Sequence, residues 1–273
     1  MAAPSKLIFA YMGNKGDIAD FIVNSFEPHK KYVEVFGGTG QVLLHKPKAD
    51  EEIYNDVNPH LTNMFEIIRT RADEFMKQLD ELIISERLYN DFFEKLDSSP
   101  DDMERAIRYF YIMTFAHMGK FTGGFSVPAA TNFNLEAKKA TIRFIQNRFR
   151  NVVVTNKSYE KIITANNNAS TTLYLDPPYV STEMYYEKLA GSFTIADHHI
   201  LRDLLKQHKG QFVLSYEADP LVSDLYSDYY ILGKNKFRPG RGEFVEEIIV
   251  TNREPNTMFG TRNTIEQFKD TLF

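Results

Sequence analysis

The stretch KYVEVFGGTG, residues 31–40, decides the fold. Its first half alternates between polar and apolar residues, which predicts a strand over 32–36, and its second half is a glycine-rich turn. The apolar run 42–44 follows and predicts the start of a helix. A strand, a glycine-rich turn and a helix in this order let the backbone approach a nucleotide-like ligand closely, in dinucleotide-binding and adenosyl-cofactor sites alike.

The third glycine position separates these two kinds of site. The dinucleotide fingerprint needs a further glycine after Gly38 and Gly40, and this chain has Leu43 there. Tight packing against a pyrophosphate is therefore not supported, and a phosphate-free adenosyl ligand fits better.

A second predicted strand, 52–56, ends in Asp56 about one βαβ step later. A carboxylate at this place can accept hydrogen bonds from both ribose hydroxyls. The alternative is that Asp56 is a turn or helix-capping acid, because Asn58-Pro59 has the pattern of a helix start with Asn58 as its cap.

The sequence Asp176-Pro177-Pro178-Tyr179 follows an apolar run, 173–175, which predicts a strand whose carboxyl end opens onto a ligand crevice. Two prolines make the turn rigid and leave the carbonyls of Asp176 and Pro177 pointing outward as acceptors. An exocyclic amine bound by the Asp176 carboxylate and the Pro177 carbonyl would turn its lone pair towards an electrophile, with Tyr179 stacked on the ring. The alternative interpretation is a proline-rich turn with a solvated aspartate.

The order of these motifs resembles the AdoMet-dependent N6-adenine DNA methyltransferases of the Dam type. In that family a Phe-x-Gly-x-Gly motif, here 36–40, precedes the acid and then the Asp-Pro-Pro-Tyr motif, here 176–179. The resemblance covers residues 9–251. It implies an α/β fold with a Rossmann-like mixed sheet and an inserted, mostly helical target-recognition subdomain. It also implies S-adenosyl-L-methionine (AdoMet) as cofactor and double-stranded DNA as substrate.

The resemblance extends to an amino-terminal motif, FAYMGNK, residues 9–15, which contributes to the cofactor pocket of the family. Together with the motifs above it assigns cofactor binding to Tyr11, Lys15, Phe36, Gly38, Gly40, Asp56 and Asp176. Catalysis is assigned to Asp176, Pro177, Pro178 and Tyr179. The mechanism implied is transfer of a methyl group to the amine of an adenine flipped out of the duplex, with Asp176 orienting the amine rather than acting as a strong base.

The segment 109–128 is similar to the family's target-recognition segment, which ends in Phe-x-Val-Pro, here 125–128. The part between Thr114 and Phe125 is several residues shorter than in Dam and lacks much of its Arg- and Asn-rich hairpin. The recognition sequence of Dam is therefore not expected here. Two further differences, Val35 for a proline and Tyr11 for a tryptophan, remove no needed functional group.

The length of 273 residues fits one large α/β domain with an insertion. Further strands are predicted over 152–155, 211–215, 229–232 and 244–251, so the sheet is expected to finish antiparallel. The expected parts are the amino-terminal part of the catalytic domain (1–71), the inserted helical target-recognition subdomain (72–147) and the rest of the catalytic domain (148–273). The tail 256–273 could pack back on the domain or contact a second subunit.

Composition narrows the class of protein. The chain has no cysteine, which excludes a disulfide framework and a thiolate metal site. Its seven histidines show no His-Glu-x-x-His spacing, so no metal is expected, and His198 and His199 are expected at the surface. No secretion signal or membrane-length apolar run is found. We therefore expect a cytoplasmic protein without a membrane partner, either a monomer or a weak dimer. The resemblance to the Dam-type family implies that it is bacterial or phage-encoded.

The net charge of −5 argues against indiscriminate binding to polyanions and requires a local basic patch for DNA. One basic cluster lies in a predicted helix and its exit (Lys138, Lys139, Arg143, Arg148 and Arg150), where a solvated helix face is the simpler interpretation. The other surrounds a predicted hairpin turn (Lys234, Lys236, Arg238 and Arg241) and is the preferred phosphate contact. Sequence recognition is expected in the insertion, where Lys120 is predicted to contact DNA. The exposed-type candidates there are His117, Lys120, Phe121 and Ser126, although Phe121 could equally be a core residue.

Other functions share parts of this pattern. An N4-cytosine methyltransferase needs the same amine geometry, but Asp rather than Ser at position 176 favours adenine. Methylation of RNA adenine, a catalytically silent DNA- or protein-binding relative and a nicotinamide-dependent oxidoreductase fit the two motifs less well. A solitary enzyme, a phage protective enzyme and the modification half of a restriction system would share all these residues.

Overall fold

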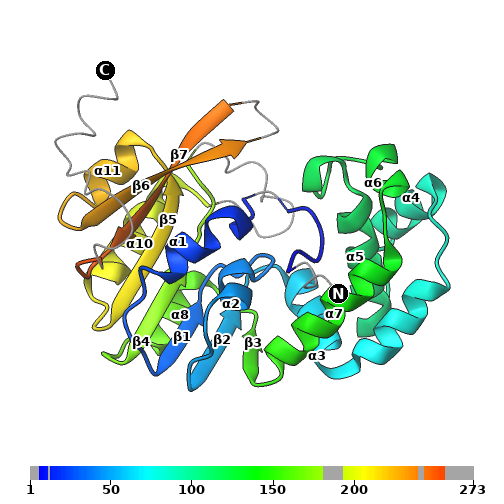
Figure 1. Cartoon of the computed structure of the whole chain (residues 1–273), viewed down its shortest axis with the longest axis horizontal. Helices are drawn as coiled ribbons and strands as arrows, with labels where there is room; N and C mark the ends of the chain where they lie inside the picture. Colours follow the sequence, from blue (N-terminus) through cyan, green and yellow to red (C-terminus); the bar gives the residue numbers. More distant parts are fainter. Residues whose placement is uncertain (1–5, 12, 181–192, 239–242, 256–273) are drawn as a thin grey trace.

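The computed structural model describes residues 6–11, 13–180, 193–238 and 243–255. Within them, seven strands form one sheet in the order β3-β2-β1-β4-β5-β7-β6 (Figure 1). Strands β1 to β5 are parallel, and β7 runs antiparallel to both β5 and β6. This confirms the predicted α/β fold and its antiparallel finish. The strands are β1 (Lys31–Glu34), β2 (Glu51–Asn55), β3 (Val152–Thr155), β4 (Thr171–Leu175), β5 (Gln211–Glu217), β6 (Tyr230–Arg238) and β7 (Glu243–Thr251).

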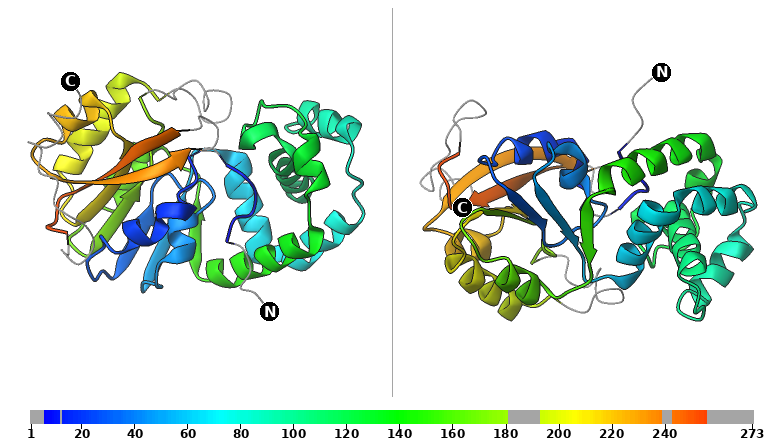
Figure 2. Two further views of the ribbon diagram at one scale, coloured as in Figure 1. Left: turned by 45° about the horizontal axis from the view of Figure 1, so that its top comes forward. Right: turned by 90° about the horizontal axis from the view of Figure 1, so that it is seen from below.

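Helices cover both faces of this sheet. Figure 2 shows α1 (Ala19–Val23) and α2 (Gln41–His45) on one face, and α8 (Tyr159–Ala165) and α10 (Ile195–Lys206) on the other. A short helix, α11 (Pro220–Leu225), joins β5 to β6, and a 3-10 turn, η1 (Gly16–Ile18), leads into α1. The result is a three-layer sandwich with a doubly covered sheet, as parallel sheets require.

The alternation in residues 31–35 divides the two cores. Tyr32 belongs to the cluster beneath α1 and α2, whereas Val33 and Val35 belong to the cluster beneath α8 and α10. Successive side chains of a strand point to opposite faces, so the period of two in the sequence becomes burial on both sides of β1. Glu34 lies on the same face of β1 as Tyr32, and this is the face that carries the candidate site described below.

A helical insertion separates β2 from β3 and lies beside the β3 edge of the sheet (Figure 1). Asn58 caps its first helix by accepting hydrogen bonds from the backbone N–H groups of His60 and Leu61, as the sequence predicts. That helix has a kink at Arg71, whose φ and ψ are −135° and 35°. The division of the chain at residues 71/72 and 147/148 stays a prediction. The insertion comprises α3 (Pro59–Asp80), α4 (Glu86–Glu94), α5 (Asp102–Phe115), the 3-10 turn η2 (His117–Gly119), α6 (Val127–Thr131) and α7 (Leu135–Phe149).

The expectation that His198 is a surface residue is wrong. Its side chain is only 1% exposed, and its Nδ1 lies 2.6 Å from the hydroxyl of Tyr216. Helix α10 turns this first-turn residue towards the sheet, where it packs edge-on against Phe193. None of the described helices combines the length and apolar character needed to cross a membrane. The tail 256–273 lies outside the described residues.

Candidate active site

The site lies where the strand order reverses. Strands β1 and β4 are parallel neighbours, with Glu34 in register with Tyr174. The glycine-rich turn and the Asp-Pro-Pro-Tyr sequence therefore leave the sheet side by side at its carboxyl edge, which is where open α/β sheets bind their ligands. Two motifs that are about 140 residues apart in the sequence are brought to one pocket by this pairing.

The glycine-rich turn is shaped by close packing and by left-handed backbone. Gly38 and Gly40 have φ values of 50° and 69°, which favour glycine. A Cβ atom on Gly37 would lie 2.2 Å from the ring of Tyr54, whose hydroxyl donates a 2.6 Å hydrogen bond to the Gly38 carbonyl. Gly38 faces the pocket, and the ring of Tyr11 lies over it. Gly40 is not among the described residues that line the pocket, and it caps α2 instead.

Asp56 occupies both of the positions considered for it. Its carboxylate lines the pocket and also accepts 2.8 Å hydrogen bonds from the backbone N–H groups of Gly38 and Asn58. Burial raises the pKa of Asp56, and the two N–H donors lower it in part. It is therefore a turn acid that holds the glycine loop and, at the same time, a carboxylate that a ligand in the pocket can reach.

Lys15 is directed at the Asp-Pro-Pro-Tyr motif. Its Nζ lies 2.7 Å from Oδ2 of Asp176 and donates a 2.8 Å hydrogen bond to the Gly13 carbonyl. The other carboxylate oxygen of Asp176 accepts a 3.2 Å hydrogen bond from the Ser215 hydroxyl. Burial raises the pKa of Asp176, while the ammonium of Lys15 opposes this rise and favours the ionised form. Lys15, only 3% exposed, therefore helps to keep Asp176 charged.

Tyr179 lies deeper than its expected stacking role suggests. Its ring is 7% exposed and packs against Tyr216, and the ammonium of Lys15 lies 5.0 Å from the ring centroid. Its hydroxyl donates a short hydrogen bond to Glu247 of β7. Pro178 lines the pocket, whereas Pro177 is buried. Stacking on a base would require a face of the Tyr179 ring to be uncovered.

Glu34 is a site residue that the sequence motifs do not reveal. It lines the pocket with a side chain that is 1% exposed, and one carboxyl oxygen accepts hydrogen bonds of 2.8 Å from the Tyr32 hydroxyl and from the Leu43 backbone N–H. Burial raises its pKa to about 8. The available signal is a lone acid between Val33 and Val35 in a strand that is buried on both faces.

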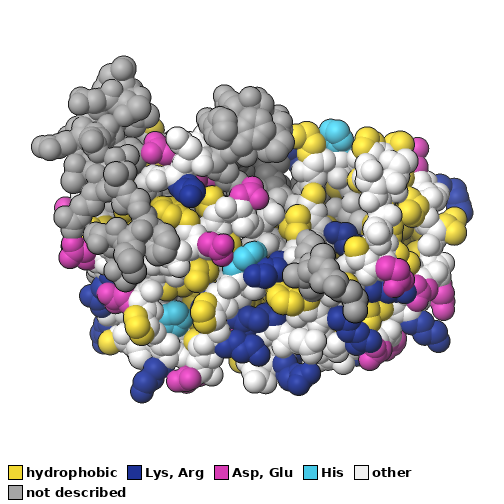
Figure 3. Space-filling model, viewed as in Figure 1, with side chains coloured by type: hydrophobic (Ala, Val, Ile, Leu, Met, Phe, Trp, Pro, Cys, Tyr) yellow, Lys and Arg dark blue, Asp and Glu magenta, His cyan; other side chains and the backbone are white. Residues whose placement is uncertain are grey.

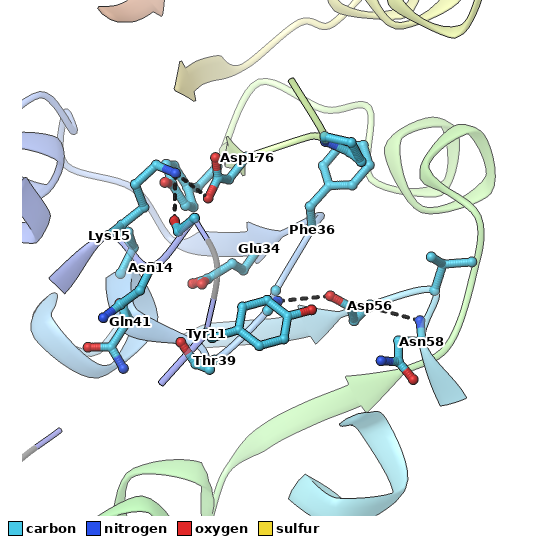
Figure 4. A pocket seen from close by; sticks show the side chains of 17 residues that line it. Tyr11, Asn14, Lys15, Glu34, Phe36, Thr39, Gln41, Asp56, Asn58 and Asp176 are labelled. Atoms are coloured by element: carbon cyan, nitrogen blue, oxygen red, sulfur yellow. Dashed lines mark hydrogen bonds and ion pairs between the residues drawn. The ribbon is translucent and has the colours of Figure 1, made fainter. Parts of the chain in front are cut away.

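Figure 4 shows how these side chains surround the pocket. Lys15 and Asp176 lie at one end, Asp56 and Asn58 at the other, and Glu34 between them. The pocket has about 690 Å³ of empty space, which includes volume open to solvent. Phe36 contributes an aromatic wall and stacks on Tyr159 with 5.9 Å between ring centroids. Of the predicted cofactor residues, the structure brings Tyr11, Lys15, Phe36, Gly38, Asp56 and Asp176 together here.

The predicted DNA contacts lie on other elements. Lys236 and Arg238 are in β6, where the register sets Arg238 opposite Glu243 of β7, and Arg241 lies outside the described residues. Lys120 follows η2 and is half-buried. Its neighbour Phe121 packs against Phe93, with ring centroids 5.0 Å apart, so its role is at least partly in the core.

The two other residues expected to be exposed in the insertion differ from each other. His117 is exposed, but Ser126 is buried and caps α6 by accepting a hydrogen bond from the Ala129 N–H. Figure 3 shows Lys and Arg side chains gathered on the lower half of one face, where α2, α3 and α7 lie. On α7, Lys139 pairs with Asp80 and Arg143 with Asp73, both of α3. Two of the five basic residues of this cluster therefore have acidic partners on α3, and Arg148 pairs with Glu52 of β2.

The described residues contain no group of three or more His, Asp or Glu side chains arranged to hold a metal ion.

Comparison with known proteins identifies the family of this chain. The family model of the D12 class N6 adenine-specific DNA methyltransferases matches residues 11–239. The DNA adenine methylase of Escherichia coli strain K12 is 24% identical over 211 residues, 73% of this chain and 75% of that protein. The DNA adenine methylase of Serratia marcescens is 25% identical over 237 residues, 81% and 87% of the two chains. The modification methylase LlaI of Lactococcus lactis subsp. lactis is 25% identical over 207 residues, 72% of this chain and 33% of that protein. Because the family model spans most of the chain and both of its motifs, this chain belongs to the D12 class N6 adenine-specific DNA methyltransferases.

Proposed function

We propose that the protein transfers a methyl group from S-adenosyl-L-methionine to the N6 amine of an adenine flipped out of double-stranded DNA. One observation carries the proposal: a single pocket is lined by the glycine-rich turn, by Asp56 and by Asp176. A cofactor held by the glycine-rich turn and Asp56 would therefore lie against the Asp176 carboxylate, which is to orient the amine.

The lining of the pocket fits a cationic, phosphate-free adenosyl ligand. Three carboxyl groups line it: Asp56, Asp176 and Glu34, of which Glu34, with a pKa raised to about 8, is largely uncharged at pH 7. The ammonium of Lys15 is already within salt-bridge distance of Asp176. Such a lining disfavours a pyrophosphate and suits a sulfonium or an ammonium group. Tyr11 and Phe36 offer aromatic surface, and Asp56 would accept the ribose hydroxyls. The cofactor would supply an already activated methyl group.

The residues of this chain would prepare the adenine. The duplex cannot present a stacked base to this pocket, so the target must be flipped out, at a cost of a few kcal/mol. Asp176, held charged by Lys15, would accept one amine hydrogen and the Pro177 carbonyl the other, which turns the nitrogen lone pair towards the cofactor. Asp176 need not remove the proton before transfer, because the methylated ammonium is acidic enough to lose it readily.

The test is methyl transfer from labelled AdoMet to unmethylated DNA of mixed sequence, followed by digestion to nucleosides and single-base mapping. We expect N6-methyladenine in one short sequence motif. A parallel reaction with RNA of the same sequence serves as the control for substrate class and should remain unlabelled. Product appearing as N4-methylcytosine, or only in RNA, would overturn the proposal.

A further inference from the structure

Glu247 lies in β7, next to the proposed catalytic residues. Its side chain is 1% exposed, and its Oε1 lies 3.2 Å from the ammonium of Lys15. The same oxygen accepts the short hydrogen bond from the Tyr179 hydroxyl. One carboxyl group thus contacts both Tyr179, at the end of the Asp-Pro-Pro-Tyr motif, and the cation that pairs with Asp176.

Two carboxyl groups share the ammonium of Lys15. Oδ2 of Asp176 lies 2.7 Å and Oε1 of Glu247 lies 3.2 Å from its Nζ. A buried cation needs one anionic partner, and a second buried carboxylate adds a desolvation penalty without being required for that purpose. Pairs of carboxylates that share one site are typical of centres where protonation is tuned. A purely structural counter-ion for Lys15 therefore does not account for Glu247.

The surroundings of Glu247 define what can influence its charge. The strand register sets it opposite Glu217 of β5 and Lys234 of β6. The hydroxyls of Tyr174 and Ser215 contact each other at 2.9 Å, and the Ser215 hydroxyl also donates to Asp176. The next residue on β7 towards the hairpin, Glu246, points to the opposite face of the sheet, which makes it a matched control.

We propose that Glu247 is a positioning residue for methyl transfer: its carboxylate holds the Tyr179 ring through the hydroxyl and, through Lys15, sets the charge available on Asp176. The inference rests on the proposed function, because it assumes that Asp176 and Tyr179 receive the adenine. Glu247 is not among the described residues that line the pocket. Its effect passes through Tyr179 and Lys15, which it contacts, and through the field of its charge at Asp176.

The first experiment compares Glu247→Gln with wild-type protein and with Glu246→Gln in single-turnover methyl transfer across pH. The charge of Glu247 raises the pKa of Asp176. Glu247→Gln removes this charge, while its amide oxygen still accepts the hydrogen bond from Tyr179. The variant should therefore stay active at lower pH than the wild-type protein. Glu246→Gln should leave the profile unmoved. An active Glu247→Gln protein with the wild-type pH profile would refute the effect of Glu247 on the charge of Asp176.

The second experiment is a double-mutant cycle with Glu247→Ala and Tyr179→Phe. Glu247→Ala should lower the single-turnover rate about tenfold or more and change AdoMet affinity by no more than about threefold. In the Tyr179→Phe background, Glu247→Ala should lower the single-turnover rate by a smaller factor, because the Tyr179 hydroxyl that Glu247 orients is already gone. Strictly additive losses would refute the link through Tyr179, and a loss explained by the unfolded fraction in urea titrations would refute both. If the wild-type protein methylates no DNA, the proposed function itself is refuted. This outcome differs from the two above, which refute only the role of Glu247.

Discussion

The ammonium of Lys15 lies 2.7 Å from Oδ2 of Asp176, although the two residues are 161 positions apart in the sequence. The amino-terminal segment that precedes η1 thereby reaches across the carboxyl edge of the sheet to the end of β4. A buried ammonium favours the ionised form of a neighbouring carboxyl, so the pair joins cofactor pocket and catalytic motif electrostatically as well as spatially.

Asp176→Asn should reduce methyl transfer by about 100-fold or more, because the amide keeps the shape of the side chain but loses the charge that orients the amine. Cooperative unfolding in urea should be preserved, since Lys15 retains Glu247 as a partner. Ser215→Ala is the control: it removes the 3.2 Å hydrogen bond to Asp176 and leaves the charge. We expect a loss below about tenfold for that variant. An Asp176→Asn variant that transfers methyl groups at the wild-type rate would show that Asp176 has no catalytic role.

Lys15→Met should shift the acidic limb of the pH–rate profile to higher pH. The positive charge of Lys15 lowers the pKa of Asp176. Without it, burial and the charge of Glu247, both of which raise the pKa, are opposed by the weaker effect of the Ser215 hydrogen bond. Activity requires the ionised carboxylate, so the variant should need a higher pH to reach its maximum rate. Single-turnover rates between about pH 5 and 9 at saturating AdoMet test this, a range that brackets a raised carboxyl pKa. An unchanged acidic limb would mean that another group controls it.

Much of this architecture follows from residues 31–40 and 173–179, because an alternating strand, a glycine turn and a run ending in Asp-Pro-Pro each dictate their local structure. Their proximity follows from β1 and β4 being neighbours, which βαβ rules favour. The strands predicted from periodicity all occur, with ends shifted by a few residues. The motif assigns Gly40 to the pocket, yet the left-handed turn directs it to the start of α2.

Glu34 and Glu247 could not be assigned from the sequence, and the reason is physical. Each is an acid in a strand, and the side-chain period of two tells which residues share a face but not which face carries a ligand. Likewise, Lys139 and Arg143 form a basic cluster along the chain, whereas their charges are compensated by Asp80 and Asp73 on a helix more than 50 residues earlier. Only the packing of α7 against α3 brings these charges together.

Glu34→Gln should flatten the pH dependence of stability. The pKa of Glu34 is about 8 in the folded protein, against an ordinary value of 4.5. Between these values the folded protein holds a proton that the unfolded chain releases, so Glu34 lowers stability as pH rises from about 4.5 to about 8. Gln has no proton to lose and should be more stable than wild type at pH 7, on the order of a few kcal/mol. Urea unfolding without cofactor at about pH 5 and about pH 8 should show the two proteins diverging. Parallel curves would contradict the burial of an uncharged Glu34.

Gly119→Ala should loosen the contact between the insertion and the cofactor pocket. Gly119 has a φ of 67°, and a Cβ atom there would lie 2.7 Å from the backbone carbonyl of Ala10, next to Tyr11. We expect a loss of about 2–4 kcal/mol of stability, together with weaker AdoMet binding. Gly124→Ala is matched in backbone, with a φ of 74°, but its Cβ would meet nothing within 4 Å. That control should cost only about 1 kcal/mol of strain. Equal losses in the two variants would show that the contact with Ala10 is unimportant.

Replacing Arg238 and Arg241 together by Ala should weaken DNA binding and flatten its dependence on salt. Each phosphate that a cation neutralises releases condensed counter-ions, so the slope of log K against log salt should fall by about 0.9 for each phosphate that the variant no longer binds. Single replacements measured between about 50 and 200 mM salt separate the contributions of the two residues. The control is Lys139→Ala with Arg143→Ala, because both side chains are held by acids of α3 and should leave the slope unchanged. A slope altered by the α7 pair and not by the hairpin pair would move the phosphate footprint from the hairpin to the helical insertion.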